Sequence, residues 1–167
     1  MTKRIVWTGI FTLVAIILQS TLLYRLALYG AVPDLALGIL VYSAYMNSMM
    51  TGQLSGFFSG LFLDFLSAAP LGLNTLIRTI IGAAVGRMSG TFFPDSLFFP
   101  MALCAGATIL KAAMFFLLHL LFAGAAPFYN LRDMTFWMEL LLNTVSAPFL
   151  FALLRLFKSL LIGKEEV

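Results

Sequence analysis

The chain has 167 residues, of which 62% are hydrophobic and 10% are charged, and its formal net charge is +3. This composition is typical of a multi-spanning membrane protein and leaves no room for a soluble domain. The single cysteine, Cys104, excludes a disulfide framework and a cysteine-based metal site. The basic residues lie scattered at the ends of apolar segments, which indicates membrane topology and not nucleic-acid binding. We therefore expect one integral membrane domain over residues 1–167, surrounded by lipid.

Six apolar segments follow one another along the chain. A hydrocarbon core about 30 Å thick needs roughly 20 apolar residues per helix. We expect an all-α, compact bundle of six transmembrane helices at about residues 5–24, 34–51, 53–67, 71–91, 97–123 and 134–158. The third segment has only about 15 residues, so it is either a short helix shielded by its neighbours or a partly re-entrant segment.

Proline and glycine mark the breaks between these segments. The breaks are at Val32-Pro33-Asp34, Thr51-Gly52-Gln53, Ala69-Pro70-Leu71-Gly72, Phe93-Pro94-Asp95 and Ala126-Pro127. Asp34 and Asp95 each follow a proline, and an aspartate in that place can accept hydrogen bonds from the free N–H groups of a helix start. We expect helices to begin there.

Glycines recur every four residues in the third and fourth segments, which puts them on one face of each helix. The two ladders are Gly52, Gly56 and Gly60, and Gly82, Gly86 and Gly90. In a bilayer, small residues at this spacing let two helix backbones approach closely. We predict internal packing for one ladder. For the other, internal packing and docking of a partner helix both stay open.

The basic residues outside the segments predict the orientation. With a cytoplasmic N-terminus, six of them lie inside and two outside. The inner ones are Lys3, Arg4, Arg87, Arg155, Lys158 and Lys164, and the outer ones are Arg25 and Arg132. The positive-inside rule then predicts that both termini are cytoplasmic, as six spans require.

Charged residues inside the segments predict a buried polar cluster. The four charges within the membrane, which sum to zero, are Asp64, Arg78, Lys111 and Glu139. Asp64 and Arg78 flank the turn at Pro70 at similar depth, so we expect them to pair. The residues expected to complete the cluster are Asn74, His119 and Asn143, with Asp34 capping it.

This cluster has two interpretations. Ionisable residues within a membrane are candidates for a ligand site or a proton relay. The other interpretation, which we favour, is that pairs of charges and amides fix the register of the helices. His119 lies among Phe115, Phe116 and Leu120, where a lone imidazole is more often a hydrogen-bonded packing residue than a switch.

The sequence contains none of the motifs that would indicate catalysis. There is no HExxH pair, no GxSxG elbow and no phosphate-binding glycine loop. We therefore predict a protein that is not an enzyme and has no catalytic residues, no cofactor and no metal site. The remaining possible functions are a scaffold, a small-molecule binder and a subunit of a larger assembly.

Several short pieces together resemble the rod-shape-determining membrane protein family MreD. They are VPDLAL at 32–37, VY at 41–42, GFFSGLFLD at 56–64 and PLGLN at 70–74. The resemblance is strongest over residues 32–90 and loose elsewhere. It implies a subunit of the bacterial cell-elongation machinery in the inner membrane. This subunit would work with MreC, a bitopic protein with a periplasmic domain, and through it with the RodA glycosyltransferase, its class B transpeptidase and MreB filaments.

The resemblance also implies a fold similar to the S components of energy-coupling-factor transporters, and this supplies the alternative function. An S component binds a vitamin or a metal near its outer face, where we expect Asp64, Arg78 and Glu139. A vitamin site needs several polar and aromatic side chains that converge from different helices and loops. The SAAPLG turn between the third and fourth segments offers no side chain suited to that task. We therefore favour the scaffold.

Overall fold

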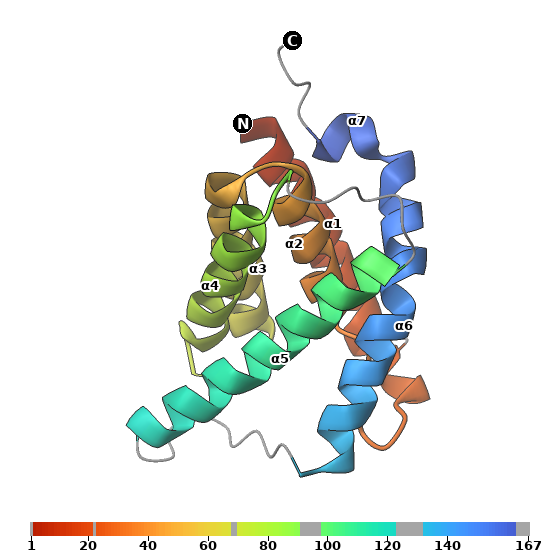
Figure 1. Ribbon diagram of the computed structural model, residues 1–167. Coiled ribbons are helices and arrows are strands. Elements are labelled where there is room, and N and C mark those ends of the chain that lie inside the picture. Colours follow the sequence, from red (N-terminus) through yellow and green to blue (C-terminus); the bar gives the residue numbers. More distant parts are fainter. Residues whose placement is uncertain (1, 22, 68–69, 91–97, 123–131, 163–167) are drawn as a thin grey trace.

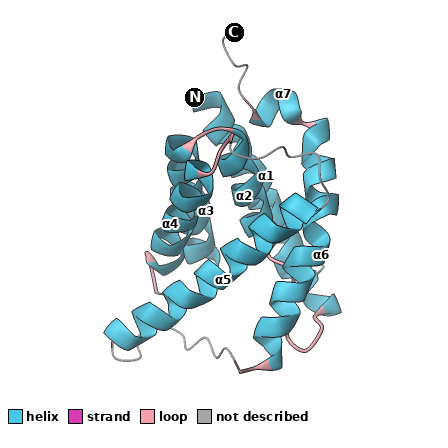
Figure 2. Ribbon diagram, in the orientation of Figure 1, coloured by secondary structure: helices cyan, strands magenta, loops and turns pink. Residues whose placement is uncertain are grey.

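The computed structural model describes residues 2–21, 23–67, 70–90, 98–122 and 132–162. This part of the chain is helical apart from its connections and one isolated bridge (Figures 1 and 2). The elements are α1 (Thr2–Thr21), a 3-10 helix η1 (Leu23–Leu26), α2 (Leu35–Met46), α3 (Met49–Leu66), α4 (Leu73–Arg87), α5 (Phe98–Leu121), α6 (Met134–Leu156) and α7 (Lys158–Leu161). The predicted all-α class is confirmed.

Figure 1 shows that the start of α1 and the short helix α7 lie at the same end of the bundle. Helices α1 to α6 alternate in direction between that end and the opposite one, which we call the distal end. Helix α5 is strongly tilted and crosses the bundle diagonally, whereas α3 and α4 lie side by side. Within the described residues, α1, α5 and α6 are long and apolar enough to cross a membrane, by length and composition alone.

Helix α2 is the core of the bundle. All ten residues from Ala36 to Tyr45 are buried, and the helix is apolar all round, as expected of a helix enclosed by others. Its side chains contact α6 through an edge-to-face pair between Tyr42 and Phe151, with ring centroids 5.1 Å apart. With 12 residues, α2 is only about 18 Å long.

The break between α2 and α3 differs from the expected one. It lies at Asn47 and Ser48, and the Ser48 side chain accepts a hydrogen bond from the Thr51 N–H as the N-cap of α3. The prediction of a break at Thr51-Gly52-Gln53 is therefore wrong, because these residues form the first turn of α3. Starting at Met49, α3 has 18 residues and is a regular helix along its whole length.

The two glycine ladders pack against each other. A Cβ atom at Gly56 would overlap the backbone carbonyl of Arg78, and one at Gly52 would overlap the carbonyl of Gly82. At Gly86 the added atom would stand 2.7 Å from the Met49 Cα. Since real Cβ atoms do not approach that closely, only glycine allows this contact between α3 and α4. Both ladders therefore serve internal packing.

Gly90 does not belong to the packed face, although its spacing suggested it. Helix α4 ends at Arg87, and Gly90 follows the helix with a φ of +73° and no neighbouring atom within 4 Å of an added Cβ. A left-handed conformation of this kind is favoured by glycine. The residue belongs to the turn that leaves α4. The break predicted at Pro94 and Asp95 lies outside the described residues.

Candidate functional site

Asp34 lies at the start of α2 and binds charged and polar groups from three other helices. Its position follows from the sequence VPD, in which the aspartate is the N-cap of α2 and its Oδ1 accepts from the Leu37 N–H at 2.9 Å. The guanidinium of Arg78 on α4 donates to both carboxylate oxygens, at 2.8 and 2.9 Å. Both side chains are buried: 8% of the Asp34 side chain and 3% of the Arg78 side chain are exposed. Both of these bonds come from the Nη2 atom of Arg78, and hydrogen bonds between charged groups are stronger than those between neutral groups.

Lys111 on α5 joins this pair to α6. Its Nζ donates to Asp34 Oδ2 at 2.9 Å and to Glu139 Oε1 at 2.7 Å. The network thus contains two carboxylates and two cations and has no net charge. A buried ionic group needs this balance, because an unpaired charge in such a place is strongly destabilising.

An amide side chain closes the network. The Oδ1 of Asn143 on α6 accepts from the backbone N–H of Asp34 at 2.6 Å, and its Nδ2 donates to the hydroxyl of Thr108 at 3.0 Å. Asn143 therefore satisfies a backbone N–H that the α2 start would otherwise leave buried without a partner. We call Asp34, Arg78, Lys111, Glu139 and Asn143 the charge network.

Two hydroxyl groups of this region were missed by the sequence reasoning. Thr108 lies one turn before Lys111 on the inner face of α5, and Ser59 on α3 accepts from Arg78 Nη1 at 3.4 Å. Both side chains are buried. The sequence spacing weakly indicated Thr108, because it lies three residues before Lys111 and therefore on the same face of the helix.

Asp64 has a different role from the one expected. Its carboxylate accepts from the backbone N–H groups of Gly72, Asn74 and Thr75, all at 3.0 Å, and from the side chains of Asn74 and Thr75 at 3.0 and 2.6 Å. The expected pair of Asp64 with Arg78 is wrong, because Arg78 contacts Asp34. The N-cap residue of α4 is Gly72, which has no side chain, so a carboxylate from α3 satisfies the free N–H groups instead.

The eight residues expected in one cluster thus separate. Five of them form the charge network, while Asp64 and Asn74 form the cap of α4. His119 lies eight residues beyond Lys111, about 12 Å further along the axis of α5, and is half-buried. Three of the four charges in the predicted neutral set, Arg78, Lys111 and Glu139, lie in the network, but its second carboxylate is Asp34 and not Asp64.

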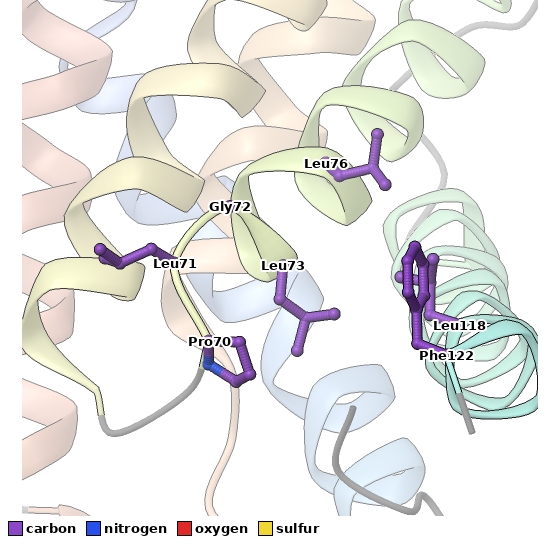
Figure 3. Close-up of a pocket in the computed structure, with 7 residues that line it drawn as sticks. All are labelled: Pro70, Leu71, Gly72, Leu73, Leu76, Leu118 and Phe122. Atoms are coloured by element: carbon purple, nitrogen blue, oxygen red, sulfur yellow. The ribbon is translucent and has the colours of Figure 1, made fainter. Parts of the chain in front are cut away.

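Three cavities of the described structure are either very small or apolar. The one beside Asp34 and Asn143 holds about 10 Å³, close to the space for a single water molecule. A groove of about 350 Å³ lies between the start of α4 and the end of α5 at the distal end (Figure 3). Its lining is Pro70, Leu71, Gly72, Leu73, Leu76, Leu118 and Phe122. This groove offers shape and apolar surface but no polar group to orient a ligand.

The cap of α4 gives a first testable prediction. Asp64→Asn keeps the shape of the side chain but replaces two charged acceptor oxygens by one neutral oxygen. Some of the backbone N–H groups at the start of α4 then lose the oxygen to which they donate. We expect the free energy of unfolding in detergent to fall by about 1 to 3 kcal/mol. Thermal unfolding of the purified protein measures this effect.

A control for this change exists at the end of α1. Thr21 is exposed there, and its hydroxyl donates to the Ile17 carbonyl of the same helix at 2.7 Å. Thr21→Val should change the stability by less than about 0.5 kcal/mol. Equal effects of the two substitutions would contradict the assigned role of Asp64.

Comparison with known proteins identifies a family for this chain. The family model of the rod shape-determining protein MreD matches residues 1–157. No curated protein and no solved structure matches the chain. Because the match covers nearly the whole chain, including every residue of the charge network and both glycine ladders, the chain belongs to the MreD family of rod shape-determining membrane proteins.

Proposed function

We propose that the chain is a non-enzymatic scaffold subunit of the cell-elongation complex in the bacterial inner membrane. In this role it binds an MreC-type bitopic protein and supports peptidoglycan synthesis along the lateral wall. Through that partner it works with a RodA-type glycosyltransferase, a class B transpeptidase and MreB filaments. Membership of the MreD family supports the proposal.

One structural observation favours a scaffold over a ligand-binding subunit. The charges of the network bind one another, and they connect four helices: α2, α4, α5 and α6. Such an arrangement fixes the relative positions of the helices. A rigid bundle is what a scaffold needs, because its partners recognise a surface of constant shape.

The alternative, a vitamin-binding subunit similar to an S component, finds less support. Ligand pockets usually have volumes of roughly 300 to 1,000 Å³ with a few polar groups placed to orient the ligand. The polar cavity beside Asp34 is far smaller, and the larger grooves of the described structure are lined by apolar residues. None of these three cavities is both large and polar.

The proposal includes an orientation with both termini in the cytoplasm. The excess of basic residues on that side motivates it. A fusion of a cytoplasmic reporter after Val167 should be active, and a periplasmic reporter at the same place should be inactive. Reporters placed after Pro70 should give the reverse pattern. A periplasmic signal at the C-terminus would contradict the orientation.

Co-purification tests the proposed function. A tagged chain extracted from membranes in mild detergent should retain the MreC-type partner, identified by mass spectrometry. Depletion of the chain should convert rod-shaped cells into round ones, because lateral wall synthesis loses its scaffold. If the purified chain carried a bound vitamin and lacked the partner, the result would instead support the transporter alternative.

A further inference from the structure

A tight turn between η1 and α2 carries a tyrosine in a conformation that side chains disfavour. Leu28 and Ala31 exchange two backbone hydrogen bonds, at 3.0 and 2.9 Å, which closes a two-residue turn. Its central residues are Tyr29, with a φ of +51°, and Gly30, with a φ of +76°. Turns of this type strongly prefer asparagine, aspartate or glycine at both places. Among the described residues, Tyr29 is the one non-glycine with a positive φ.

The residues that the structure describes do not bury the tyrosine side chain. Tyr29 is 70% exposed, and Leu28 beside it is 51% exposed. The turn itself is held in place, because the Thr135 hydroxyl at the start of α6 donates to the Tyr29 carbonyl at 3.2 Å. The tyrosine is thus presented outward from an anchored backbone. Residues kept in unfavourable conformations often have a functional reason.

The turn lies beside other exposed apolar side chains. The hydrogen bond from Thr135 places it against the first turn of α6, where Met134 and Trp137 are each 55% exposed. Figure 1 shows the segment after η1 next to the start of α6, at the distal end. Arg25 in η1, four residues before Tyr29, is exposed and adds a positive charge. We call Leu28, Tyr29, Met134 and Trp137 the aromatic patch.

The lipid–water interface alone does not explain the patch. Tyrosine and tryptophan are enriched at membrane interfaces, but a lipid headgroup layer accepts an aromatic ring from many positions on a helix. It does not require the ring at a turn position that favours glycine or asparagine. A protein partner does require one fixed place, and rigid aromatic side chains are the residues that most often dominate such contacts.

We infer that the aromatic patch is the docking surface for the segment of the MreC-type partner that leaves the membrane at the distal end. This inference rests on the proposed function and names the surface that it uses. The fitting segment presents apolar side chains to Tyr29 and Trp137 and a carboxylate to Arg25. The glycine faces of α3 and α4 are not available for this contact, because each is covered by the other.

A substitution that relieves the strain provides the test. Tyr29→Asn suits the positive φ, so membrane abundance and thermal stability should stay equal or rise. Recovery of the partner in a detergent pull-down should nevertheless fall roughly tenfold, as expected for loss of a dominant aromatic contact. Tyr29→Phe keeps the ring and should retain recovery. Leu71→Asn is the control, since Leu71 is 73% exposed at the same end but lies outside the patch.

A photoreactive phenylalanine at position 29 supplies the second measurement. Irradiation of membranes should give an adduct with the MreC-type partner, whereas the same probe at position 71 should not. Adducts with lipid alone, or full recovery of the partner with Tyr29→Asn, would overturn the inference and leave the proposed function intact. Failure of the unmodified chain to recover the partner would overturn the proposed function itself.

Discussion

Replacement of Asp34 by asparagine is expected to be among the most harmful single changes in this protein. The variant keeps the size of the side chain but removes the carboxylate that binds both Arg78 and Lys111, while the ion pair of Lys111 with Glu139 remains. Loss of one partner from a buried ionic group costs about 3 to 5 kcal/mol. Because couplings between polar groups in membrane proteins are often smaller, we expect a value toward about 3 kcal/mol. Thermal unfolding in detergent and the amount of protein in membranes measure the loss.

A double variant tests whether the loss of stability comes from the unbalanced charge or from the loss of the Asp34 carboxylate itself. Asp34→Asn combined with Arg78→Met removes one charge of each sign and leaves the pair of Lys111 and Glu139. We expect this variant to regain a large part of the stability and of partner recovery that Asp34→Asn alone loses. If it were less stable than either single variant, the network would not act through its neutrality. Stable complexes with lost cell-shape function in every variant would favour a ligand site or a proton relay.

Replacement of Gly56 by isoleucine is the second change with a large expected effect. The new side chain would collide with the Arg78 carbonyl, which is backbone and cannot move aside as a flexible side chain can. Overpacking of this kind costs about 1 to 3 kcal/mol and occasionally more, and a backbone collision belongs at the upper end. We expect α3 and α4 to separate, with lower membrane abundance and weaker partner recovery.

Gly106 offers the matched control for this experiment. It lies within α5, and nothing stands within 4 Å of an added Cβ. Gly106→Ile should therefore leave stability within about 0.5 kcal/mol of the unmodified protein. If Gly56→Ile and Gly106→Ile behaved alike, the contact between α3 and α4 would be looser than the structure indicates.

The sequence was most informative about periodic features and least informative about contacts across the bundle. Spacing by four placed the glycines on one face of each helix, but it could not show that the two faces meet. Gly90 has the same spacing and lies beyond the end of α4. The break at Ser48 was missed because Thr51 and Gly52 resemble turn residues, whereas Gly52 is required by the approach of Gly82.

The charge network shows a similar limit. The neutral sum was taken over Asp64, Arg78, Lys111 and Glu139, but Asp34, which was expected only as a cap, takes the place of Asp64 in the observed network. Depth alone suggested that Asp64 binds Arg78. The pairing depends instead on the direction in which each side chain leaves its helix, and Asp64 faces the free N–H groups at the start of α4. Such directions follow from the assembled bundle and not from the distance of a residue to the nearest turn.

The short central helix has a consequence for how the protein enters the membrane during synthesis. With 12 residues, α2 is too short to cross a hydrocarbon core alone, and Asp34 at its start is charged. Its stabilising cations belong to α4 and α5, which leave the ribosome later. The nascent α2 must therefore stay beside the insertion machinery, or in contact with α1, until Arg78 arrives. We therefore expect insertion to be cooperative, with these helices released into lipid as a group.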